Sequence, residues 1–187
     1  MKFDGQQSDE KVLYVITPHN SKLILSIFFT TISILAVGAF LFGVTTFFPE
    51  FINLLRTIIV LMLLLGTIIA GWWIWQAQVH DRTYITDRRI IRFDVVSPFF
   101  TNKRALFWNE VLKAKAYAPN MIIRILKIGV LQIEPVAAEH ESIIIPDVYY
   151  HEDLANYLDK ILFTFKNKPA DMTTIKPFIA KPKGKRD

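Results

Sequence analysis

Two long uncharged segments near the start of the chain constrain its fold more than any other feature. Residues 23–48 carry no charged side chain, and neither do residues 57–75. As a helix, the first segment would extend about 39 Å at about 1.5 Å per residue, enough to cross a hydrocarbon core of about 30 Å. The second approaches the roughly 20 residues that a span requires. Because the connection around Pro49 and Glu50 is short, the sequence predicts an antiparallel two-helix transmembrane hairpin over residues 23–76.

The charges beside the two segments predict their orientation. Cations flank the open end of the hairpin, whereas Arg56 alone lies near the connection. The flanking cations are Lys11, Lys22, Arg82, Arg88 and Arg89. Since cytoplasmic flanks carry the excess of lysine and arginine, both termini are predicted to be cytoplasmic, with residues 1–22 as an N-terminal segment. The aromatic anchors at that interface would be Trp72, Trp73 and Trp75.

The hairpin is predicted to be an anchor and not a transport path. Neither segment has an ionisable side chain near its middle, where ion and proton pathways require one. Small residues four positions apart, such as Ala39 and Gly43, allow helices to approach closely. They fit either packing within the hairpin or a dimer face. A cleaved signal peptide fits less well, because its apolar region runs only about 7–15 residues.

A period-two pattern replaces the continuous apolar pattern after His80. Apolar and polar residues alternate in short stretches separated by Pro, Gly and Asn, as is typical of strands. The expected strands are 82–86, 90–97, 104–108, 111–118, 130–134 and 142–145. Leu154, Leu158 and Leu162 then recur at helical spacing. The sequence therefore predicts an α+β chain, in which an antiparallel sheet or barrel over residues 80–165 ends in a C-terminal helix.

The order of motifs resembles that of the bacterial pleckstrin-homology-like (PH-like) domain, and of the YdbS-like membrane proteins in particular. Tyr84, Thr86 and Arg89 match the family's tyrosine–threonine–arginine hairpin after two transmembrane helices, with a slightly different spacing between the first two. The segments "LFWNEVLKAKAY", "RILKIGVLQIEP" and "IIIPDV" follow in the family's order. The resemblance covers about residues 10–165. It implies a barrel-like sheet of about seven strands, capped by one helix, at the bacterial inner membrane, and it implies no enzymatic activity.

The net charge of +5 does not belong to the strand region. Residues 81–162 have 11 basic and 11 acidic side chains, whereas residues 163–187 have seven basic and two acidic ones. A nucleic-acid interface needs a concentrated cationic face, so nucleic acid is not a predicted partner. Arg88, at the turn of the first hairpin, faces either a lipid headgroup or water. Arg89 is predicted to pair with a neighbouring carboxylate, since Asp81, Asp87 and Asp94 lie in the same hairpin, or with backbone carbonyls.

Two further segments are candidates for lipid contact. Residues 121–128 are mostly aliphatic but include Arg124 and Lys127, and they form either an interfacial turn or, as we favour, part of the core. Residues 166–187 are proline-containing and basic, which predicts a disordered tail. That tail either solubilises the chain or lies on anionic lipid. Its candidate lipid contacts are Lys181, Lys183, Lys185 and Arg186.

No sequence pattern indicates a catalytic residue, a metal or a cofactor. The chain has no cysteine, and its four histidines lack metal-ligand spacing. Neither a nucleophile motif nor a glycine-rich phosphate loop occurs. The sequence thus predicts a non-enzymatic binding or scaffolding module that recruits a protein partner, or its own copies, at the membrane. The alternative is lipid binding or envelope-stress sensing at the membrane surface.

Overall fold

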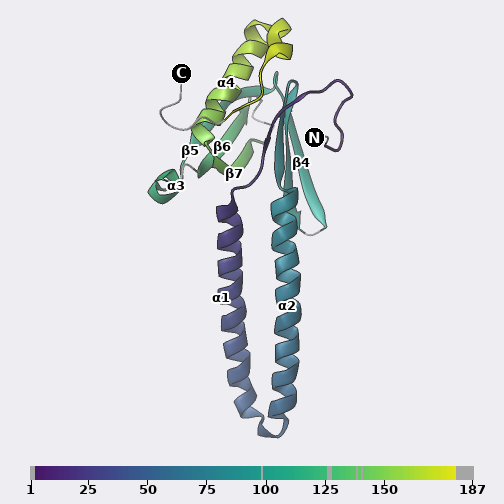
Figure 1. Ribbon diagram of the computed structural model, residues 1–187, viewed down its shortest axis with the longest axis vertical. Helices are drawn as coiled ribbons and strands as arrows, with labels where there is room; N and C mark the ends of the chain where they lie inside the picture. Colours follow the sequence, from purple (N-terminus) through teal and green to yellow (C-terminus); the bar gives the residue numbers. More distant parts are fainter. Residues whose placement is uncertain (1–2, 98, 126–127, 138, 140, 180–187) are drawn as a thin grey trace. The chain divides into compact units, whose positions relative to one another are not determined.

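The chain folds as two compact units. The computed structural model describes residues 3–97, 99–125, 128–137, 139 and 141–179. One unit combines Met1–His19 with His80–Asp187, and the other is Asn20–Val79. Figure 1 shows the two long helices, labelled α1 and α2, and the strands, of which β4 to β7 carry labels. The fold class is α+β, with two long apolar helices followed by two antiparallel sheets and a C-terminal helix.

The helical unit consists of α1 (Asn20–Val44) and α2 (Ile52–His80), joined by the 3-10 turns η1 (Thr45–Phe47) and η2 (Pro49–Phe51). By length and composition, both helices are apolar and long enough to cross a membrane. Almost none of the residues in the two apolar windows are buried, unlike those of a core helix in a water-soluble protein. Threonine hydroxyl groups within the helices form local hydrogen bonds. Thr31 on α1 donates to the carbonyl of Ile27, and Thr67 on α2 donates to the carbonyl of Leu63, both at 2.8 Å.

The strands form two antiparallel sheets. The first sheet has the order β1-β2-β3-β4, and the second has the order β5-β6-β7. The strands are β1 (Val12–Ile16), β2 (Arg82–Thr86), β3 (Arg89–Ser97), β4 (Phe100–Phe107), β5 (Val111–Tyr117), β6 (Ile128–Pro135) and β7 (Ile143–Tyr149). All six strands predicted from the sequence are present. β7 continues through Pro146, which lies where the register with β6 shifts, and proline is tolerated at such an irregularity in an edge strand.

A seventh strand, β1, lies before the first helix, where the sequence analysis assigned none. It pairs antiparallel with β2, in a register that aligns Val12 with Thr86 and Ile16 with Thr83. The pairing partner is separated from it in the sequence by the whole helical unit, so local alternation alone could not identify it. Both ends of the helical insertion are therefore joined to neighbouring strands of one sheet.

The core lies between the sheets and α4 (His151–Asn167). The buried face of α4 includes Leu154, Leu158 and Ile161, and the helix packs against β5 and β6. The short helix α3 (Met121–Ile125) connects β5 to β6. Trp108 is fully buried, and its indole Nε1 donates to the carbonyl of Thr86 at 3.0 Å. That bond satisfies the one polar group of the largest side chain in the core.

The prediction of a disordered tail from residue 166 is wrong for residues 166–179. α4 ends at Asn167, and η3 (Pro169–Thr174) follows, with Met172 and Ile175 buried in the core. Phe178 contacts the ring of Tyr14 on β1, and Tyr157 on α4 donates to the carbonyl of Lys176 at 2.8 Å. Burial also raises the pKa of Tyr157 to about 12. Three apolar side chains, those of Met172, Ile175 and Phe178, thus pack a segment of polar average composition against the core. Residues 180–187 lie outside the described part of the chain.

Gly129 gives a direct test of the packing between β6 and α4. A Cβ at this position would lie 2.4 Å from Cδ2 of His151, whose side chain is buried at the start of α4. We expect Gly129→Ala to lower the free energy of unfolding by about 1–3 kcal/mol, because the ring must move within a packed core. Denaturant unfolding of the full chain in detergent would measure the loss.

His151→Ala provides the control for this clash. If the ring is the obstacle, the double variant should lose less stability than the two single losses combined. Strict additivity would contradict the packing described here.

Candidate functional site

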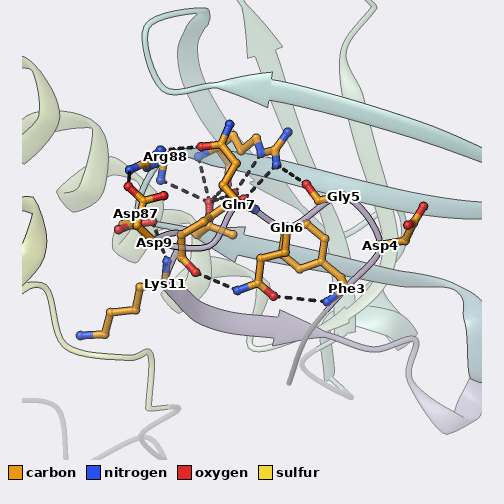
Figure 2. A network of polar contacts seen from close by, with 12 residues as sticks. Phe3, Asp4, Gly5, Gln6, Gln7, Asp9, Lys11, Asp87 and Arg88 are labelled. Atoms are coloured by element: carbon orange, nitrogen blue, oxygen red, sulfur yellow. Dashed lines mark hydrogen bonds and ion pairs between the residues drawn. The ribbon is translucent and has the colours of Figure 1, made fainter.

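The turn between β2 and β3 is enclosed by the N-terminal segment. Figure 2 shows residues 3–11 folded around this turn, with polar side chains of both segments facing each other. The backbone amide of Lys11 donates to Oδ1 of Asp87 at 3.0 Å, and the amide of Asp87 donates to the carbonyl of Lys11 at 3.1 Å. This reciprocal pair continues the β1–β2 ladder up to the turn.

Arg89 and Glu10 form the buried centre of this network. Arg89 donates through Nε to Oε1 of Glu10 at 2.9 Å and through Nη2 to Oε2 at 2.8 Å. The Glu10 side chain is fully shielded from solvent, and that of Arg89 is 13% exposed. Thr86 Oγ1 also donates to Oε1 of Glu10 at 2.9 Å, and the Gly5 carbonyl accepts from Arg89 at 2.9 Å. The expected backbone carbonyl contact of Arg89 is present, but its carboxylate partner is Glu10, 79 positions earlier, and not a neighbouring aspartate of the hairpin.

These contacts keep the Glu10 carboxyl ionised. Burial alone would raise its pKa, but hydrogen bonds from Arg89, the Gln7 amide and Thr86 outweigh burial and lower that pKa below its usual value of 4.5. A carboxyl with a lowered folded-state pKa stabilises the fold above its unfolded-state pKa. That stabilisation is lost as the pH falls through the folded-state pKa.

Arg88, the predicted candidate for a headgroup contact, has partners within the chain. Its guanidinium forms an ion pair with Asp9 and donates to Oε1 of Gln7. Its side chain remains 42% exposed, so the pair borders solvent. The N-terminal segment thus supplies the carboxylate of Asp9 as the anion at the turn. Arg88 thereby links this segment to the β2–β3 hairpin.

Two further cations of the first sheet, Arg92 and Lys103, also have partners within the chain. Arg92 is largely buried and lies 3.1 Å from Oδ1 of Asp94 and 3.9 Å from Oδ1 of Asp81. Lys103 on β4 donates to the carbonyl of Asp4 at 2.9 Å. The network therefore joins the N-terminal segment to the first sheet. Because its described cations bind partners within the chain, the network does not form a concentrated cationic surface for a phosphate.

Sequence reasoning did not assign a role to the acidic residues that complete this network. It sought partners for the hairpin arginines among the aspartates of the hairpin itself, and only Arg92 pairs in that way. The partners of Arg88 and Arg89 are Asp9 and Glu10, 79 positions away in each case. The signal that could have identified them is the acidic pair directly before the apolar stretch Val12–Ile16.

The remaining candidate residues lie away from this network in the sequence. Arg124 is exposed on α3, where Met121 and Ile125 are 78% and 71% exposed. With Ala118 and Asn120, these three residues line an open surface hollow of about 530 Å³. Ile128 is buried, so the favoured core packing of this segment applies to Ile128 but not to Met121 or Ile125. The candidates outside the described residues are Lys127, Lys181, Lys183, Lys185 and Arg186.

The three tryptophans predicted as interfacial anchors lie in the last third of α2. Trp72 and Trp75 are exposed at 44% and 56%, and Trp73 is half-buried.

Among the described residues, no group of three or more His, Asp or Glu side chains could hold a metal ion. Comparisons with protein-family models, curated proteins and solved structures find no match to this chain.

Glu10→Gln tests the buried pair. We expect it to lower the free energy of unfolding by about 3–5 kcal/mol near neutral pH, because Arg89 would lose the charge that balances it in a largely buried position. It should also flatten the decline in stability as the pH falls below about 4.5, the usual pKa of this carboxyl. Denaturant unfolding of the full chain in detergent across that pH range would measure both effects.

Asp9→Asn is the matched control, because it removes the neighbouring but exposed ion pair with Arg88. Exposed pairs contribute less than about 1 kcal/mol, so this variant should retain the pH dependence. Equal losses in the two variants would contradict a special role for Glu10.

Proposed function

We propose that the chain is a membrane-anchored binding module. α1 and α2 cross the bacterial inner membrane as a hairpin, and both termini lie in the cytoplasm. The length and apolar surface of the two helices support this anchor. The cations beside the open end of the hairpin support the orientation.

We further propose that the strand unit is a PH-like domain of the YdbS-like kind. Its seven strands and C-terminal helix support that assignment. One backbone bond supports a barrel-like closure, because it joins the segment after β1 in the first sheet to β7 in the second. In this bond the amide of His19 donates to the carbonyl of Asp147 at 3.1 Å.

The observation that carries the binding function is the open edge of β4. Among the described strands, β4 pairs only with β3 and ends the first sheet. Its residues Thr101, Asn102 and Lys103 are exposed. An exposed strand edge binds an extended segment of another chain by backbone hydrogen bonds. The module would therefore recruit a protein partner, or a second copy of itself, at the membrane surface without chemical catalysis.

A second candidate function is lipid binding at α3. Met121 and Ile125 expose apolar side chains there beside the guanidinium of Arg124. That combination suits an interfacial segment, in which apolar groups enter the bilayer and a cation meets the headgroups.

A photo-crosslinking amino acid at Asn102 would test the binding function in native membranes. We expect reproducible protein adducts from this position, because it lies on the open edge of β4. The same amino acid at Asp159, on the exposed face of α4, serves as the control. An adduct of twice the chain mass would identify a second copy as the partner, whereas equal or absent protein adducts at the two positions would contradict binding at β4.

A further inference from the structure

The tip of the β3–β4 hairpin exposes an unusual amount of apolar surface. Val96, Phe99 and Phe100 are 64%, 84% and 73% exposed. Ser97 pairs with Phe100 across the hairpin, so these side chains gather at one end of a two-stranded ribbon. Contiguous exposed aromatic surface in a water-soluble region marks a binding site or a membrane contact.

The charge pattern of the hairpin favours a membrane contact. No charged residue occurs from Val95 to Asn102, and the nearest charges on the two strands are Asp94 and Lys103. Those charges already have partners, in Arg92 and the carbonyl of Asp4. A short apolar tip of this kind can enter an interface without carrying an unpaired charge into it.

The strand register shows which way the tip points within the unit. β2 begins at Arg82, which aligns with Phe93 on β3. The four residues after Phe93 on β3 carry the hairpin roughly 13 Å beyond the start of β2, at about 3.3 Å per residue. The chain enters β2 directly from the end of α2 at His80.

The exit toward α1 lies at the same end of the sheet. β1 ends at Ile16, which aligns with Thr83 near the start of β2, and α1 begins at Asn20. Both covalent connections to the apolar helices therefore leave the strand unit at the end toward which the β3–β4 tip extends.

We propose that this tip inserts into the membrane interface as a third attachment point, through Val96, Phe99 and Phe100. The partner that the apolar tip contacts is the lipid bilayer itself. This inference rests on the proposed function, because it requires α1 and α2 to cross the membrane. It adds a third contact with the membrane to the two covalent connections that join the strand unit to α1 and α2.

Single cysteines in the cysteine-free chain allow a direct test. Val96→Cys would carry a nitroxide label, with the full chain reconstituted in lipid nanodiscs. Relaxation by oxygen and by a water-soluble nickel chelate would report the depth of the label. Leu64→Cys, within α2, is the reference for lipid, and Asn109→Cys, exposed beyond the other end of β4, is the reference for water.

We expect the label at Val96 to be relaxed more by oxygen than by the nickel chelate, as at Leu64. Replacement of Phe99 and Phe100 by serine should shift the oxygen-to-nickel relaxation ratio at Val96 toward the ratio at Asn109. If the label at Val96 gave the same oxygen-to-nickel relaxation ratio as Asn109 while the label at Leu64 was exposed to lipid, the tip insertion alone would be overturned. The same would follow if the serine replacements left a lipid-exposed Val96 label unchanged. A Leu64 label with the ratio found in water would overturn the membrane anchor, and the tip insertion with it.

Discussion

The buried ion pair between Glu10 and Arg89 is the interaction on which the strand unit depends. Arg89 stands at the start of β3 and Glu10 just before β1, so their two hydrogen bonds join the segment before the helices to the hairpin after them. Thr86 adds a hydrogen bond to Oε1 of Glu10, and the Gly5 carbonyl accepts one from Nη2 of Arg89. Because a buried charge without its partner is strongly unfavourable, this pair specifies where the N-terminal segment must lie.

That placement makes the helical hairpin an insertion between two paired strands. The chain leaves the sheet after β1 and returns to it at β2, its antiparallel neighbour. The first sheet therefore needs both segments, and the hydrophobic core includes Leu13 and Ile16 from β1 with Ile85 from β2. With this connectivity, both ends of the helical unit are joined to the strand pair β1–β2.

Local patterns in the sequence predicted the local features of the fold. Uncharged length predicted α1 and α2, alternation predicted β2 to β7, and leucine spacing predicted α4. Contacts between distant segments were beyond such patterns: β1 requires a partner across the whole helical unit, and Glu10 is 79 positions from Arg89. The segment after α4 was misjudged because Met172, Ile175 and Phe178 are only three apolar anchors in a polar stretch. Arg92 pairs within the hairpin, but the partners of Arg88 and Arg89 could not be assigned without the register of β1.

Hydrogen–deuterium exchange of the full chain in lipid nanodiscs tests most directly whether the N-terminal segment belongs to the strand unit. The paired amides of β1, between Val12 and Ile16, should be protected to the same degree as those of their partners in β2. Rapid exchange throughout Val12–Ile16, beside slow exchange in β2 and β3, would contradict the account, because the sheet would then be complete without the segment that precedes the helices.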